Sequence, residues 1–412
     1  MRITRVDALL MSCPLREPLR LPFHGGERTI LKRDAMLIRV VTDTGLTGYA
    51  PGPAHERAAR EIRDVIGPWL DGRDPRQWAT FDFPGDLELR KTYRAVELAL
   101  LDLVGRHEGA PLSDVAGGRC RDRIKLYGSA GMYMSPEGYA AEAAAIQAMG
   151  FPAYKMRPAL GPDADLRTVE LMHQATGDGF GLMIDAHSWW RMGDASYSPD
   201  TVEQLARAMD AHDITWLEEP LPPDDHDAYR RLRAAVSTPL ASGEHEQDVP
   251  GLLDLIDTGA VCYVQMDVCC QGGLPAFTAV ARATEARGLR FAFHCWGTTL
   301  EVLASAHLGV CWPASVVEWL EHPCHGNRGR AGMYPFELAD DILAEPLPIE
   351  GGDLVVPDGP GLGIAIDESV IERYPFLPGP WSYFRLDAPS STVAVTGDHS
   401  VKWIDATSGQ SA

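Results

Sequence analysis

Residues 214–245 read ITWLEEPLPPDDHDAYRRLRAAVSTPLASGEH and contain one complete structural unit. Two short apolar runs, ITWL and PLAS, are each followed by acidic residues: Glu218 and Glu219 after the first, Glu244 after the second. The polar stretch between them begins at Asp224 and Asp225, residue types that commonly cap helices. A strand, a helix and a second strand in this order predict a βαβ unit of a parallel sheet.

The same unit recurs along the second half of the chain. Short apolar runs are followed by an acidic, basic or histidine residue at steps of 23 to 33 residues: Lys155, Asp185, Glu218, Glu244, Asp267, His294 and Glu318. One βα unit of a TIM barrel has about this length, since eight units take roughly 250 residues. An earlier run, IKLYGSAG, supplies a first strand, so we expect eight strands between about residues 124 and 320. Side chains at the carboxyl ends of such strands converge on one cavity.

Changes in hydrophobic periodicity and composition along the chain predict four regions. Residues 1–123 alternate in β fashion and then become helical, which indicates a small α+β domain, and residues 124–345 form the barrel. Residues 346–385 are rich in Gly and Pro and are expected to return to the first domain. Residues 386–412 are small and polar, so we expect a flexible tail.

Composition narrows the class of protein. The net charge of -21 argues against nucleic acid and anionic membranes as partners. The eight cysteines form no CxxC pair, which favours reduced thiols. The first residues contain too short an apolar segment for a signal peptide, and no stretch approaches about 18 apolar residues. We therefore expect a cytoplasmic enzyme.

Three converging carboxylates predict a metal site. Each of Asp185, Glu244 and the pair Glu218-Glu219 could by itself cap a helix, but their recurrence at the barrel period argues against independent caps. Carboxylate oxygens with open positions suit Mg²⁺, whereas zinc would favour His or Cys. Spacing alone does not choose between Glu218 and Glu219.

His294 and Asp267 predict a proton-transfer pair. His294 by itself could be a core histidine bonded to the backbone. Asp267 ends the preceding strand, however, so the two side chains would be neighbours. A carboxylate that orients one imidazole nitrogen frees the other as a general base.

The chain resembles the enolase superfamily, in its mandelate racemase subgroup, over its length up to about residue 375. The resemblance rests on several segments in order: RAVELALLDLVGRHEGAPLSDVAGGRCRDRIKLYGS, YKMRP, IDAH, WLEEP, SGEH, MDV with FHCWG, and PDGPGLGI. It implies a modified TIM barrel, (β/α)7β, with an N-terminal α+β capping domain.

The resemblance also implies roles for individual residues. Glu218 would join Asp185 and Glu244 in binding Mg²⁺, and Asp267 with His294 would form the acid–base dyad. Lys155 and Glu318 would flank the substrate carboxylate, with Glu321 in WLEH as the alternative to Glu318.

Arg157 departs from the pattern of the family's racemases, which place a second lysine there as a base. A guanidinium stays protonated and is a poor base but a good carboxylate clamp. A transfer that inverts one carbon needs a base on both faces, so Arg157 counts against racemisation and favours elimination, for which one base suffices.

Finer resemblance indicates the sugar-acid dehydratase branch that includes rhamnonate dehydratase. The substrate would be an aldonic or aldaric acid, dehydrated through an enediolate to a 2-keto-3-deoxy acid. Substrate contacts are expected from His24, in a loop LPFHGGERT that would close over the site, and from His187, His245 and Trp296. Packing under loops is the alternative for these four, and His187 could instead be a second acid.

Other classes stay open on the same scaffold. A racemase, epimerase or cycloisomerase of a carboxylate is the alternative enzyme, and a non-catalytic binding protein is the alternative class. The resemblance implies a homo-oligomer, an octamer or a dimer.

Overall fold

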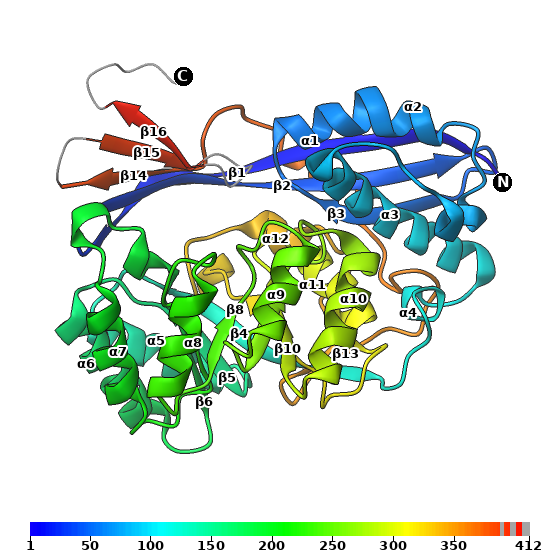
Figure 1. The fold of residues 1–412 in the computed structure, drawn as a ribbon. Coiled ribbons are helices and arrows are strands. Elements are labelled where there is room, and N and C mark those ends of the chain that lie inside the picture. Colours follow the sequence, from blue (N-terminus) through cyan, green and yellow to red (C-terminus); the bar gives the residue numbers. More distant parts are fainter. Residues whose placement is uncertain (388–390, 396–400, 406–412) are drawn as a thin grey trace.

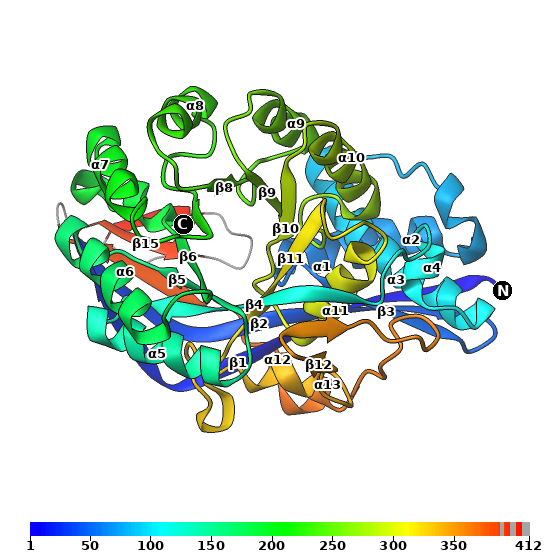
Figure 2. The ribbon, with the colours of Figure 1, turned by 90° about the horizontal axis from the view of Figure 1, so that it is seen from below.

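Eight parallel strands close into a barrel. The computed structural model describes residues 1–387, 391–395 and 401–405. The barrel strands in chain order are β4 (Arg123–Met132), β5 (Ala153–Arg157), β6 (Gly181–Asp185), β7 (Trp216–Glu218), β8 (Leu240–Ser242), β9 (Tyr263–Met266), β10 (Arg290–Phe293) and β11 (Val317–Pro323). Each strand pairs with the next, and β11 pairs with β4, which closes the sheet (Figure 2).

Seven helices connect the eight strands in the described part of the chain. They are α5 (Pro136–Ala148), α6 (Pro162–Thr176), α7 (Pro199–Met209), α8 (His226–Ala235), α9 (Val249–Asp257), α10 (Gly273–Ala286) and α11 (Thr299–Gly309). Capping side chains begin several of them: the Ser198 hydroxyl accepts from the backbone N–H of Thr201, and Asp225, at one of the predicted caps, accepts from that of Ala228. The predicted (β/α)7β barrel is confirmed.

The interior of the barrel is filled by side chains that point inward from alternate strand positions. Large and small apolar residues fill one layer, namely Tyr127, Ala153, Met183, Trp216, Ala241, Ala292 and Trp319. Because successive side chains on a strand point to opposite faces, the residue two positions later also points inward. Lys155, Asp185 and Glu218 stand two positions after Ala153, Met183 and Trp216, so strand geometry sends these charged groups into the barrel above the apolar layer.

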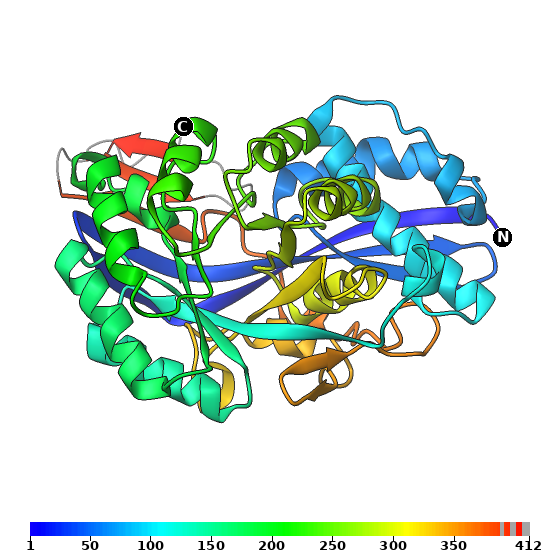
Figure 3. The ribbon, with the colours of Figure 1, turned by 60° about the horizontal axis from the view of Figure 1, so that its bottom comes forward.

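An antiparallel sheet built mostly from the first 52 residues lies across one end of the barrel (Figures 1 and 3). Its strands are β1 (Ile3–Phe23), β2 (Gly26–Thr42), β3 (Thr47–Gly52), β14 (Ser382–Leu386), β15 (Ser391–Val395) and β16 (Val401–Asp405). β1 pairs along β2, while β3 and β14 share the other edge of β2. Of the tail predicted from residue 386, positions 388–390, 396–400 and 406–412 lie outside the described residues.

Short helices and one long helix complete the cap. They are α1 (Glu56–Glu61), η1 (Ile62–Ile66), α2 (Gly67–Leu70), η2 (Pro75–Thr80), α3 (Leu87–Glu108) and α4 (Leu112–Val115). Asp86 caps the start of α3, and Gly109 ends it with a φ of 69°, a left-handed conformation that favours glycine. No helix in the described ranges is both long and apolar enough to cross a membrane.

The remaining elements follow barrel strand ends or join barrel to cap. They are η3 (His187–Trp190), η4 (Gly193–Ala195), η5 (Asn327–Gly329), α12 (Glu337–Asp341), β12 (Ile349–Glu350), β13 (Asp353–Val355) and α13 (Val370–Arg373). β13 pairs antiparallel with β4, beside the point where the barrel closes.

Candidate active site

A cavity of about 980 Å³ lies between the cap and the carboxyl ends of the barrel strands. Asp185, Glu244 and His294 line it from the barrel, and Arg28 and Arg33 line it from β2 of the cap. Four of the residues singled out by their spacing therefore share one chamber with residues of the first domain, namely Asp185, Glu244, Asp267 and His294.

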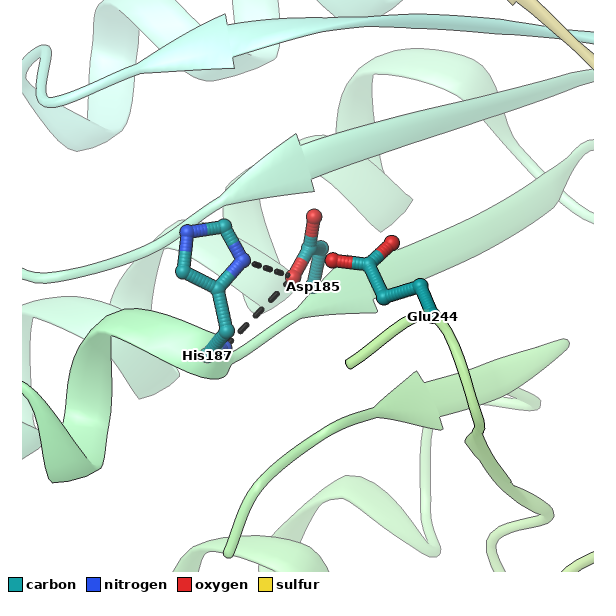
Figure 4. A group of neighbouring side chains, drawn as sticks. All are labelled: Asp185, His187 and Glu244. Atoms are coloured by element: carbon teal, nitrogen blue, oxygen red, sulfur yellow. Dashed lines mark hydrogen bonds and ion pairs between the residues drawn. The ribbon is translucent and has the colours of Figure 1, made fainter. Parts of the chain in front are cut away.

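Asp185 and Glu244 come together with His187 at the barrel mouth (Figure 4). One potential ligand atom from each lies within 4.8 Å of the others, and His187 Nδ1 is 2.7 Å from Asp185 Oδ1. A second group of the same kind joins Glu244 to Glu219 and His245. Glu244 Oε2 is buried, accepts no hydrogen bond among the described residues and lies 3.2 Å from His294 Nε2. A donor set dominated by carboxylate oxygens fits a divalent cation.

Glu218 lies deeper than this group and belongs to neither of the two sets. Its Oε1 accepts from Lys155 Nζ at 2.6 Å, and its Oε2 accepts from Trp216 Nε1 and Gln265 Nε2, both at 2.8 Å. Glu219 is equally buried, but its backbone has a φ of 43° and its carboxylate contacts His245 Nδ1 at 2.5 Å. The two neighbouring glutamates thus face different partners.

Lys155 and Arg157, at the end of β5, are surrounded by carboxylates. Lys155 Nζ lies 2.6 Å from Glu218, 3.1 Å from Glu321 and 3.7 Å from Asp185. Arg157 lies 3.1 Å from Asp185 and 3.4 Å from Glu321. We call Lys155 and Arg157 the barrel cations; both are buried, and each has more than one counter-charge.

Burial and neighbouring charges shift the pKa values of Glu218 and Glu321 in opposite directions. Burial raises the pKa of Glu321, but the charges of Lys155, His294 and Arg157 outweigh it and lower that pKa to about 2. Burial raises the pKa of Glu218 to about 8, because the nearby carboxylates oppose the effect of Lys155. Two carboxyl groups in one cluster are therefore held in opposite directions, as is typical of catalytic sites.

His294 follows β10 and lies between two carboxylates. Its Nδ1 is 3.4 Å from Asp267 Oδ2, and its Nε2 is 3.2 Å from Glu244 Oε2. Burial lowers its pKa, but the charges of Glu244, Asp267 and Glu321 outweigh burial and raise it to about 10. The structure thus brings the Asp267–His294 pair together, with Nε2 on the side of the acidic cluster.

Glu318 was expected beside the substrate carboxylate, but the structure corrects this expectation: Glu318 lies away from Lys155 and Arg157. It is the second residue of β11, and its carboxylate accepts from Arg290 Nη1 at 2.5 Å and from Tyr263 at 3.0 Å, residues that begin β10 and β9. The strand continues to Pro323, so Glu321 lies in the cluster with Lys155 and Arg157, and it accepts from the backbone N–H of Cys295 at 3.0 Å. Both residues fit the period, 24 and 27 positions after His294, so spacing could not separate them.

His24 is the second correction. His24 and Gly25 form the turn of the β1–β2 hairpin, in which Phe23 pairs with Gly26, and His24 is exposed. Phe23 lines the cavity instead. The other three expected contact residues, His187, His245 and Trp296, do line it.

Several cavity residues went unnoticed in the sequence. Tyr133 has a φ of 50°, is buried and shares a hydrogen bond of 3.1 Å with the Ser188 hydroxyl. Glu301 accepts from the backbone N–H of Trp296 at 2.9 Å. Arg28 carried a weak signal, because it occupies a buried position in the alternating part of β2, where an apolar residue would be expected.

Comparison with known proteins identifies the family. A profile described as "Enolase C-terminal domain-like" matches residues 138–370. The chain is 31% identical over 391 residues to D-galactarolactone cycloisomerase of Agrobacterium fabrum, covering 91% of this chain and 99% of that one. The chain belongs to the enolase superfamily.

Other enolase-superfamily relatives extend the range of named activities. D-gluconate dehydratase of Thermoproteus tenax is 27% identical, over 82% of this chain and 69% of its own. Among solved structures, 3,6-anhydro-D-galactonate cycloisomerase of Zobellia galactanivorans superposes with a TM-score of 0.74 at 26% identity, over 91% of this chain and 99% of that one. The relatives are thus enzymes named for sugar acids, as the sequence predicted, and they include cycloisomerases as well as dehydratases.

Proposed function

We propose that this enolase-superfamily chain is a Mg²⁺-dependent dehydratase of a sugar acid, which removes the C2 proton and eliminates the 3-hydroxyl to give a 2-keto-3-deoxy acid. The observation that carries the proposal is the asymmetry of the cavity. His294, oriented by Asp267, offers an imidazole nitrogen on one side, while position 157 holds a guanidinium that cannot act as a base. One base supports elimination but not inversion of a carbon.

Asp185, Glu218 and Glu244 are the residues proposed to hold the cation. Asp185 and Glu244 already lie within ligand distance of each other, and Glu218 adjoins them beneath Lys155. Bound there, Mg²⁺ would neutralise charge that develops on the substrate carboxylate and so acidify C2.

Side chains of the barrel supply the charge stabilisation and the proton transfer. Lys155 and Arg157 present fixed positive charge to the reacting carboxylate, and Glu321 holds both in place through contacts of 3.1 and 3.4 Å. A cation bound at Glu244 would compensate the charge that does most to raise the pKa of His294. The Nε2 of His294 then takes the C2 proton, because Asp267 faces the other ring nitrogen. The proton then passes from His294 to the departing 3-hydroxyl, so water leaves and the enol becomes a 2-oxo acid.

A cycloisomerase is the second candidate, and the 31% identity to D-galactarolactone cycloisomerase favours it. The same single base would remove the proton beside the carboxylate. The group that leaves the neighbouring carbon would then be the ring oxygen of a lactone, and no water would be lost.

The test is a panel of aldonic acids, aldaric acids and their lactones, incubated with Mg²⁺ and assayed for 2-oxo acids with semicarbazide. Mass spectrometry of each positive reaction then separates the candidates. A product lighter by one water establishes dehydration, whereas a product of unchanged mass from a lactone establishes cycloisomerisation. A silent panel that exchanges deuterium at C2 in D₂O would contradict both and favour racemisation or epimerisation.

A further inference from the structure

We propose that the substrate carries a second carboxylate, distal to the reacting one, and that Arg28 and Arg33 of the cap bind it. The inference rests on the proposed function, since it takes the reacting carboxylate to lie at the barrel cations. It narrows the substrate class to open-chain aldaric acids, in preference to aldonic acids and to lactones, in which one carboxyl group is an ester. We call Arg28 and Arg33 the cap arginines.

The cap arginines are buried charges that form no ion pair within the described residues. Each is 6% exposed, and the Nε of each is buried without a hydrogen-bond partner. Within the described residues, no carboxylate forms an ion pair with either side chain. A guanidinium stays protonated, and burying an unpaired charge is costly, so an anion supplied from outside the chain is the expected partner.

The contacts that the cap arginines do make position them without neutralising them. Arg28 lies 4.8 Å from the ring centre of Phe384, its cross-strand neighbour, and 5.2 Å from that of Trp381. Arg33 lies 4.6 Å from the Trp381 ring and donates to the carbonyl of Trp296 at 2.5 Å. Aromatic faces and a carbonyl fix the planes of both guanidinium groups but carry no full negative charge.

The acidic residue next to Arg33 in sequence does not serve as its partner. Asp34 lies 2.9 Å from Lys32 Nζ and accepts from the Ser12 hydroxyl at 2.7 Å. Lys32 and Asp34 thus form a neutral pair, and the excess positive charge of this wall belongs to the cap arginines.

Arg157, the other buried arginine of the described residues, contacts the carboxylates of Asp185 and Glu321. Arg121, which lies outside the cavity lining, also has a buried Nε without a hydrogen-bond partner, but its guanidinium donates to the backbone carbonyls of Gly309 and Val317. Among the arginines that are buried at the cavity, the cap arginines thus lack the carboxylates that Arg157 has.

The separation of the two sites suits a dicarboxylate. Both Arg157 and Arg33 lie over the Trp296 ring, 3.9 and 5.4 Å from its centre, so their guanidinium carbons are no further apart than the sum of these distances. The six carbons of a hexaric acid, joined by bonds of about 1.5 Å, span roughly 6 Å when extended. Arg157, Arg28 and Arg33 line one cavity, so a single molecule can contact a barrel cation and a cap arginine.

The experiment compares matched acids and matched variants. Binding of galactarate and galactonate, which differ in the second carboxylate, is measured by calorimetry with Mg²⁺, and turnover is measured in parallel. The variants are Arg28→Met and Arg33→Met, and the control is Arg39→Met. Arg39 lies on the same strand, β2, but it pairs with Asp7 and Glu368 and does not line the cavity. Glucarate and gluconate repeat the comparison with another stereochemistry.

We expect the unmodified protein to favour the dicarboxylate by about 10- to 100-fold, the effect of a charge-assisted hydrogen bond. Arg28→Met and Arg33→Met should lose this preference through weaker binding of the dicarboxylate, while Arg39→Met keeps it. If the methionine variants fail to fold, Arg28→Lys and Arg33→Lys keep the charge but lose the planar fork, and the preference should fall in part.

The outcomes separate this inference from the proposed function. Equal binding of the two acids by the unmodified protein, or an unchanged preference in both variants, overturns the role of the cap arginines even if monocarboxylates are dehydrated. Arginine-dependent binding of dicarboxylates without any conversion supports that role and counts against the dehydratase.

Discussion

The barrel cations and the cap arginines are two pairs of buried positive charges beside one cavity, which Arg157, Arg28 and Arg33 line, and they differ in whether carboxylates surround them. Lys155 and Arg157 are surrounded by the carboxylates of Asp185, Glu218 and Glu321. Arg28 and Arg33 face aromatic rings and have no carboxylate in the described residues. The first pair belongs to a preorganised cluster that is complete without ligand, whereas the second is electrostatically incomplete. The difference suggests a division between reaction chemistry at the barrel and substrate selection at the cap.

The largest expected effect is at the barrel cations. Lys155→Met would leave Glu218 and Glu321 buried with one fewer counter-charge, which should lower the free energy of unfolding by about 3–5 kcal/mol. It should also lower kcat/KM by a hundredfold or more, since a charge aimed at the reacting carboxylate is lost. Denaturant unfolding and steady-state kinetics measure the two effects. A variant as stable as the unmodified chain would contradict the view of a preorganised cluster.

Replacement of His294 should separate chemistry from binding. His294→Asn should lower kcat by about 10²- to 10⁴-fold, the usual contribution of a general base, while substrate still binds with Mg²⁺. Kinetics and calorimetry on the same preparation test this, and the preference for a second carboxylate should persist because the cap arginines are untouched. Sizeable residual turnover would remove His294 from the role of base.

Removal of the metal should act at the barrel alone. A chelator should abolish turnover, and Mg²⁺ at about a hundred times its dissociation constant should restore a stability increment of about 2.7 kcal/mol. Thermal unfolding with and without Mg²⁺ measures the increment. Asp185→Asn should lose it and Arg28→Met should keep it; an increment retained in Asp185→Asn would place the cation elsewhere.

The two glutamates of β11 form a matched pair. Glu321→Gln weakens the contacts to both barrel cations and should lower kcat/KM by about 10- to 100-fold. Glu318→Gln affects a half-exposed pair with Arg290 at the other end of the strand and should change stability by less than about 1 kcal/mol, with activity retained. Steady-state kinetics of both variants decide which glutamate belongs to the active site. A larger loss of activity in Glu318→Gln than in Glu321→Gln would support Glu318, as first expected from the sequence.

The smallest expected effect is on stability at the cap. Arg28→Met removes an unpaired buried charge, so the free energy of unfolding should stay within about 1 kcal/mol or rise. Arg106→Met is the matched change in the same domain, and it should cost about 1–3 kcal/mol because Asp102 loses its charged partner. Chemical denaturation of both variants measures the contrast. Equal destabilisation would indicate that Arg28 is a structural residue.

The sequence by itself determined the barrel and most of its polar lining. Apolar runs with the period of a βα unit give the strand order, and strand alternation sends Lys155, Asp185 and Glu218 inward whatever the loops do. The pairing of Asp267 with His294 followed in the same way, because these residues end neighbouring strands.

Only the tertiary structure decided where strands end and what the cap contributes. Glu318 and Glu321 both fit the period, and the continuation of β11 to Pro323 places the later one beside the barrel cations. His24 was expected at the site, but the hairpin register turns Phe23 inward and leaves His24 exposed. Arg28 and Arg33 show their missing partners only once the cap is packed on the barrel, because whether a charge is paired depends on contacts between segments far apart in the chain.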